Sequence, residues 1–241
     1  MPAPTLTTAD GLALVGRHWL TATAPDAAVV IVHGFSASSE CPQVAALADA
    51  LHADGLDVIT YDARGHGGSE GESTLGDDEA HDVAAAVELA RQRASRVVVV
   101  GASMGGIAAL RYVVTDPGVA GAVVVSCPAA WRLPRNARGV LGALMTRTSL
   151  GRRVTARYVG VRVAARWTNP EPPVALAARV RVPVAYVHGA RDRLIPARDA
   201  AELVAATPDP KRFTLVPEMG HAFDPLALVA IRDAVEWVLR A

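Results

Sequence analysis

The chain of 241 residues is long enough to form one α/β domain with a large buried core. Hydrophobic residues make up 51% of it and 24 basic residues balance 24 acidic ones, which argues against disorder and against a nucleic-acid partner. The N-terminal segment lacks the features of a signal peptide, and no apolar run is long enough to span a membrane. Cys41 and Cys127 form neither a disulfide framework nor a zinc site, so we expect a cytoplasmic protein without metal or cofactor.

The first third of the chain alternates between strand and helix patterns. Residues 12–20 predict one or two antiparallel strands, and residues 27–32 and 58–61 predict buried strands because their apolar residues are consecutive. Apolar residues spaced three and four apart predict helices around 44–51 and over 77–93.

The same alternation continues to the C-terminus. It predicts strands at 97–100, 122–125, 183–187 and 213–216, and helices after residue 103, at 197–206 and at 228–238. Such a sequence folds as a mostly parallel sheet with helices on both faces. Functional residues are then expected at the carboxyl ends of the strands.

Residues 128–180 interrupt this pattern. They occupy the place of a single crossover helix but are far longer than one. We therefore predict a small helical lid inserted into a core formed by residues 1–127 and 181–241. Three apolar side chains of this lid are candidates for lining an acyl pocket, although they would equally serve to pack the lid onto the core: Trp131, Leu144 and Trp167.

The lid is also rich in arginine. Glu171 is the one acidic residue among the arginines of this region, which are Arg132, Arg135, Arg138, Arg147, Arg152, Arg153, Arg157, Arg162, Arg166, Arg179 and Arg181. A basic lid attracts an anionic substrate or surface, whereas a solvated helical face enriched in arginine by codon bias has no such role. Both interpretations fit this composition.

The most informative motif is Gly-Ala-Ser-Met-Gly at 101–105. It follows four consecutive valines and precedes a helical pattern, so its context is strand, sharp turn and helix. This context is typical of a nucleophile elbow, in which glycines allow a tight turn that exposes a strained serine. Ser103 is therefore the candidate nucleophile, the competing interpretation being an ordinary helix N-cap.

A serine nucleophile needs a base and a group that orients the base. Asp192 and His221 each follow a later predicted strand, and the order Ser, Asp, His is that of α/β-hydrolases. The backbone N–H groups of Phe35 and Met104 are the candidate donors of an oxyanion hole.

The remaining histidines receive no catalytic assignment. We expect His33 to hold its loop through a side-chain hydrogen bond, and we expect His66 to be part of the loop architecture. His18, His52, His81 and His188 show no partner pattern, and no spacing suggests metal ligands.

Three motifs together resemble one branch of the α/β-hydrolase family. These are His-Gly-Phe at 33–35, Asp-Ala-Arg-Gly-His-Gly-Gly-Ser at 62–69 and the elbow at 101–106. They are similar to the monoacylglycerol-lipase and serine-aminopeptidase-like branch. The resemblance implies an α/β-hydrolase fold with Ser103, Asp192 and His221 as the triad. It further implies hydrolysis of a carboxylic ester in preference to a thioester or amide. Dehalogenases and epoxide hydrolases of this fold have Asp at the nucleophile position, where this chain has Ser103.

We therefore expect a serine hydrolase that cleaves a small-molecule carboxylic ester through an acyl-enzyme. A thioesterase, an amidase or a hydrolase of carbon–carbon bonds would use the same triad. A third possibility is a ligand-binding protein of the same fold without turnover. No oligomeric state is predicted.

Overall fold

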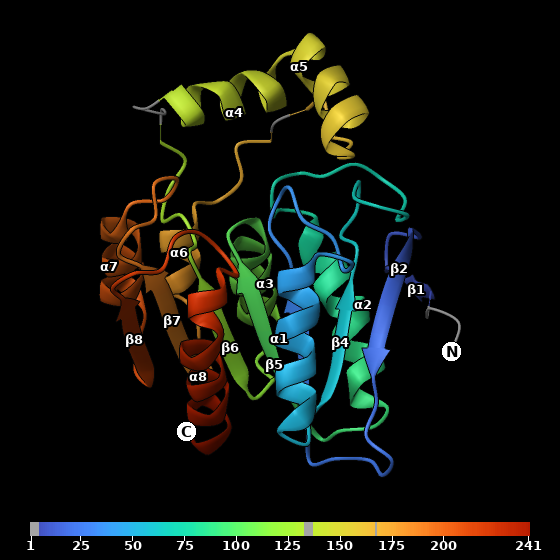
Figure 1. Ribbon diagram of the computed structural model, residues 1–241, viewed down its shortest axis with the longest axis vertical. Coiled ribbons are helices and arrows are strands. Elements are labelled where there is room, and N and C mark those ends of the chain that lie inside the picture. Colours follow the sequence, from blue (N-terminus) through green and yellow to red (C-terminus); the bar gives the residue numbers. More distant parts are fainter. Residues whose placement is uncertain (1–4, 133–136, 167) are drawn as a thin grey trace.

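The computed structural model describes residues 5–132, 137–166 and 168–241, which form an eight-stranded sheet with the strand order β1-β2-β4-β3-β5-β6-β7-β8 (Figure 1). β1 and β2 pair antiparallel to their neighbours, and the strands from β4 to β8 are parallel. The strands are β1 (Thr5–Thr7), β2 (Ala13–Trp19), β3 (Ala27–Val32), β4 (Asp57–Tyr61), β5 (Arg96–Ala102), β6 (Gly121–Val125), β7 (Val184–Gly189) and β8 (Lys211–Val216). This is the α/β-hydrolase architecture that the sequence predicts.

Helices cover both faces of the sheet because its central strands bury side chains on both sides. On β3, Val29 packs toward α1 (Pro42–Ala53) and α8 (Leu228–Arg240), which lie together in front of the sheet in Figure 1. The next residue, Val30, packs toward the opposite layer, since successive side chains of a strand point to opposite faces. That layer contains α2 (Glu79–Arg91), α3 (Met104–Thr115), α6 (Pro173–Ala177) and α7 (Ala197–Ala206).

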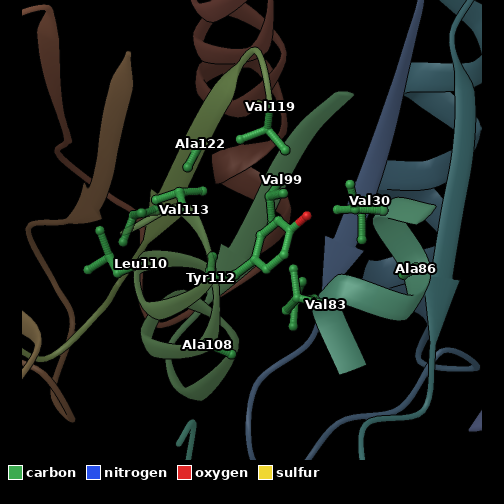
Figure 2. Close-up of a cluster of buried hydrophobic side chains, with 14 of the residues drawn as sticks. Val30, Val83, Ala86, Val99, Ala108, Leu110, Tyr112, Val113, Val119 and Ala122 are labelled. Carbon is green, nitrogen blue, oxygen red and sulfur yellow. The ribbon is translucent and has the colours of Figure 1, made fainter. Parts of the chain in front are cut away.

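Figure 2 shows part of this second layer. Tyr112 of α3 lies between the sheet valines Val30 and Val99 and the side chain of Val83 from α2. All four are almost completely buried. This packing fixes α3 against the sheet and thereby fixes the turn from which α3 begins.

The segment between β6 and β7 contains the predicted lid. Its helices α4 (Ala137–Arg147) and α5 (Ser149–Val154) and a π-helical turn η1 (Thr155–Val159) stand beyond the carboxyl ends of the strands (Figure 1). We call residues 137–159 the helical cap. The fourth helix of the segment, α6, instead packs with buried side chains against α3 and α7 in the main body. The lid boundaries at 128 and 180 stay a prediction.

Two short contacts join the chain just after the helical cap to the main body. His66 forms an isolated bridge with Val161, and Ser73 forms one with Val163. The backbone of Arg162 lies between them, donating to the carbonyl oxygen of Gly65 at 2.8 Å and accepting from the N–H of Ser73 at 2.7 Å. None of the described helices is long and apolar enough to span a membrane.

Candidate active site

Ser103 lies in the turn between β5 and α3, with φ 53° and ψ −113°. A positive φ is strained for a residue with a side chain, and such strain is typical of functional turns. The turn is tight: a Cβ on Gly101 would collide with the carbonyl oxygen of Gly105, and a Cβ on Gly105 with that of Val32. The two glycines therefore have the steric role that the elbow motif predicts.

The structure brings together the three residues that the sequence singled out. His221 Nε2 lies 3.0 Å from Ser103 Oγ, and His221 Nδ1 lies 2.7 Å from Asp192 Oδ2. Asp192 comes from the loop after β7 and His221 from the loop after β8. The side chain of Ser103 makes no capping bond to α3, which excludes the interpretation of Ser103 as an ordinary N-cap.

Asp192 is held as a buried, ionised acceptor. Its side chain is fully buried, and its Oδ1 accepts hydrogen bonds from the N–H groups of Leu194 at 2.8 Å and Ile195 at 2.9 Å. Burial alone would raise its pKa, but the hydrogen bond and charge of His221, with these two N–H groups, hold the pKa of Asp192 below its usual value. The carboxylate can thus orient His221 and stabilise its protonated form.

The predicted oxyanion hole lies beside the nucleophile. Met104 is the first residue of α3, where N–H groups have no partner inside the helix. The loop after β3 passes close to the serine, since a Cβ on Gly34 would lie 3.5 Å from the Cβ of Ser103. The peptide N–H of Phe35 follows Gly34 directly. The arrangement is suited to two backbone donors near one carbonyl oxygen.

His33 orients the peptide that carries the Phe35 N–H group. Its Nδ1 lies 2.8 Å from the carbonyl oxygen of Gly34, and its Nε2 accepts from the N–H of Ala63 at 3.0 Å. One neutral tautomer, protonated on Nδ1, satisfies both bonds. Burial, aided by the charge of His66, lowers the pKa of His33 to about 4. The predicted structural role of His33 is confirmed.

Two further histidines support the loops of the site. His66 Nε2 lies 2.6 Å from the carbonyl oxygen of Phe35, which supports its expected part in the loop architecture. His188 at the end of β7 is buried, and its Nε2 lies 3.1 Å from the carbonyl oxygen of Ile195 and 3.9 Å from Asp192 Oδ2. The sequence analysis missed His188. Its position four residues before Asp192 was the one feature of the sequence that indicated a place beside the site.

A cavity of about 490 Å³ opens at the nucleophile. It is lined by Ser103 and His221, by the loop after β3, by the start of α1 and by the loop after β8. Among the described residues, none of the helical cap lines it. Trp131 donates its indole N–H to the carbonyl oxygen of Pro170 at 2.7 Å, and Leu144 is 53% exposed. Trp167 lies outside the described residues, so an acyl pocket formed by these three side chains stays a prediction.

No metal site accompanies this cavity in the part of the chain that the structure describes. Those residues contain no group of three His, Cys, Asp or Glu side chains placed to hold a metal ion.

The parallel sheet, the strained serine turn and the Ser–His–Asp arrangement define an α/β-hydrolase. A sequence profile of the serine aminopeptidase S33 family matches residues 23–174, more than half of the chain, and the protein belongs to this family of hydrolases. An uncharacterized protein of Mycobacterium tuberculosis is 28% identical over 218 residues, which cover 89% of this chain and 70% of that protein.

Solved structures share the fold at lower identity. An esterase of Pyrococcus furiosus superposes with a TM-score of 0.71 at 21% identity, covering 99% of this chain and 88% of its own. A putative aryl esterase of Burkholderia cenocepacia gives a TM-score of 0.69 at 20% identity, covering 99% of this chain and 100% of its own. An esterase of a Rhodococcus species gives a TM-score of 0.69 at 20% identity, covering 98% of this chain and 97% of its own.

Proposed function

We propose that the protein is a carboxylic ester hydrolase that acts through an acyl-enzyme on Ser103. The observation that carries the proposal is the continuous hydrogen-bonded line from Ser103 through His221 to Asp192, with distances of 3.0 and 2.7 Å. The cavity at Ser103 gives a substrate access to the nucleophile. The names of the three structural neighbours, all described as esterases or as a putative esterase, support the ester as the bond that is cleaved.

In the first half-reaction Ser103 Oγ attacks the ester carbonyl carbon while its proton moves to His221 Nε2. The N–H groups of Phe35 and Met104 bind the oxygen that becomes negatively charged. The carbon–oxygen bond to the alcohol then breaks, and His221 gives its proton to the departing oxygen. The product of this step is an ester of Ser103 with the acyl group.

In the second half-reaction water replaces the alcohol. His221 removes a proton from the water, whose oxygen attacks the acyl carbon of the acyl-enzyme. The bond to Ser103 Oγ breaks, and His221 returns the proton to the serine. Asp192 stays ionised throughout and stabilises the imidazolium form of His221.

Hydrolysis of p-nitrophenyl esters, measured beside Ser103→Ala, tests this proposal. We expect kcat to fall by about 10⁴-fold or more in the variant, because the remaining groups bind substrate without a nucleophile. The matched control is Ser149→Ala, since Ser149 begins α5 in the helical cap and is not part of the triad.

A fluorophosphonate probe gives the second readout. We expect it to label Ser103 in the wild-type protein and to leave Ser103→Ala unlabelled. A labelled protein that cleaves thioesters or amides but no ester would contradict the ester assignment while keeping the serine nucleophile. A protein that neither reacts with the probe nor turns over any ester would contradict the enzymatic function itself and favour a ligand-binding role.

A further inference from the structure

The cavity at Ser103 adjoins a second cavity of about 280 Å³ between α1 and α8. Residues of α1 and the start of α8 form its outer walls, among them Ala46, Leu47 and Leu228. Four residues line both cavities, which are therefore direct neighbours: Gln43, Phe223, Asp224 and Pro225. The two helices that enclose the second cavity lie side by side in front of the sheet in Figure 1. We call the two cavities together the α1–α8 groove.

The second cavity is almost entirely apolar. Its two polar side chains are Gln43 and Asp224, and the carboxylate of Asp224 already has partners within its own loop. Asp224 Oδ1 accepts from the N–H of Leu226 at 2.9 Å, and its Oδ2 accepts from the N–H of Gly220 at 3.0 Å. The described lining of the cavity thus contains no cationic group and no set of convergent polar groups, and both oxygens of its one carboxylate already accept backbone hydrogen bonds. An apolar ligand suits this lining, because a polar ligand would lose its hydrogen bonds to water and find no partners in the cavity to replace them.

The position of the second cavity next to the cavity at Ser103 indicates the occupant. A group attached to the ester carbonyl has to leave the nucleophile along an open direction, and the described lining leads from Ser103 past Phe223 to α1. Cys41 lines the first cavity and Leu47 the second, and six residues of helix advance by about 9 Å. The groove is therefore long enough to receive an extended chain rather than a single small substituent.

We propose that the α1–α8 groove binds an unbranched alkyl chain of the substrate. This inference rests on the proposed ester hydrolysis and extends it to a substrate class, namely esters with one long apolar chain. Each methylene group that enters the groove leaves water and raises kcat/KM by about fourfold, until the chain reaches the end of the second cavity. Short esters fill only the first cavity and are poorer substrates.

Ala46→Trp tests the groove. Ala46 is exposed on α1 and lines the second cavity, so we expect an indole ring at this position to occupy the cavity from its outer wall. The readout is the ratio of kcat/KM for p-nitrophenyl octanoate to that for p-nitrophenyl acetate. We expect this ratio to fall by about tenfold or more, which corresponds to two or more methylene groups excluded from the groove.

Ala53→Trp is the matched control. Ala53 is also exposed on α1 but lines neither cavity, so the same substitution there is expected to keep the wild-type ratio. A second series compares octyl acetate with ethyl acetate and shows whether the chain belongs to the acid or to the alcohol. A loss of chain preference in either series supports the groove. An unchanged ratio in both series overturns it.

A binding measurement separates failure of the groove from failure of the proposed function. Fluorescence titration with dansyl-undecanoate is carried out on Ser103→Ala, alone and combined with Ala46→Trp or with Ala53→Trp. We expect the Kd to rise by about tenfold with Ala46→Trp only. If the wild-type protein cleaves no ester but this pattern appears, the groove stands and the hydrolase proposal fails. If Ala46→Trp leaves the Kd unchanged, the groove is refuted whatever the hydrolysis shows.

Discussion

The loops at the carboxyl ends of the strands and the helical cap are built in opposite ways. The side chains of Asp192 and His33 in the loops are completely buried, and each makes two or more hydrogen bonds to its surroundings. In the cap, Leu141, Leu144 and Leu150 are 58%, 53% and 70% exposed. The arrangement of Ser103, His221 and Asp192 is thus fixed by the body of the protein. The cap lies beyond the ends of the strands in Figure 1, so its sequence can change without disturbing this arrangement.

The helices of the cap depend on one another more than on the body. Thr155 of η1 donates its hydroxyl to the carbonyl oxygen of Met145 in α4 at 3.1 Å, and Gly151 of α5 lies directly against the backbone of Leu144. Segments with few buried apolar contacts open at lower free energy than the core does. We therefore expect substitutions in the loops at the carboxyl ends of the strands to lower activity or stability. Equivalent substitutions in the cap are expected to leave both unchanged.

The largest effect is expected for Asp192→Asn. An amide at this position keeps the shape of the carboxylate but presents an NH2 group to His221, which favours the wrong imidazole tautomer. We expect kcat to fall by about 10⁴-fold with little change in Tm. Asp233→Asn, on the exposed side of α8, is the control and keeps its activity. A loss of less than tenfold for Asp192→Asn would mean that another group orients the histidine.

A pH-dependent loss of stability is expected from His33. Its pKa is about 4 in the folded protein, against 6.5 as the ordinary value, so the unfolded chain binds the proton more tightly. Stability contributed by neutral His33 is complete above pH 6.5 and is lost as the pH falls through 4. The protonated ring would no longer accept from the N–H of Ala63.

Urea unfolding at pH 7, 5.5 and 4 measures this effect against His33→Asn. Between pH 7 and pH 4 the wild-type free energy of unfolding should fall by about 3 kcal/mol more than that of the variant, which lacks the titrating group. Comparison of the two proteins removes the contribution of the acidic residues, which titrate in both. Parallel curves would show that His33 is not the group responsible.

A smaller effect is expected for Glu79→Gln. Glu79 is fully buried at the start of α2, and its carboxylate accepts from Ser73 Oγ at 2.6 Å, Thr74 N–H at 3.0 Å, Thr74 Oγ1 at 2.7 Å and Gly76 N–H at 2.9 Å. Gln has one acceptor oxygen and an NH2 group that would face donors. We expect a loss of about 2 kcal/mol in the free energy of unfolding. Glu88→Gln, exposed on the same helix, should change it by less than about 0.5 kcal/mol.

The elements that the sequence predicts correctly are those determined locally. The consecutive valines of β5 and the glycines beside Ser103 specify strand and turn by their own steric properties, and the structure has them as predicted. The ends of elements depend on neighbours: β8 begins at Lys211, two residues before the predicted strand, because Lys211 pairs with Val184 of β7. The three members of the site were predictable because each follows a strand, and the ends of parallel strands meet.

The residues that hold the loops by hydrogen bonds were not predictable in this way. Glu79 accepts hydrogen bonds from a loop before α2, and no sequence motif reveals that contact. His188 contacts the loop that holds Asp192, and the sequence offers only its position four residues before Asp192 as a signal. The direction of the cavity was missed for the same reason. It depends on how the start of α1 packs against the loop after β8, and residues 41 and 223 are far apart in the chain. Such tertiary contacts decide where a substrate lies.

The smallest effect is expected in the cap, where Leu144→Ser combined with Leu150→Ser tests the other side of the comparison. Both side chains are more than half exposed, so their removal should change the free energy of unfolding by less than about 0.5 kcal/mol. Leu203→Ser in α7, a residue that is 1% exposed, should cost about 3 kcal/mol or more.

The same pair of cap substitutions decides between two places for the substrate chain. If the chain lies in the α1–α8 groove, the double variant keeps the wild-type ratio of kcat/KM for p-nitrophenyl octanoate to that for the acetate, because Leu144 and Leu150 line neither cavity. If the ratio falls while the free energy of unfolding stays constant, Leu144 or Leu150 contacts the substrate. The acyl pocket then belongs to the cap, as its apolar residues first predicted, and the loops supply the catalytic groups alone.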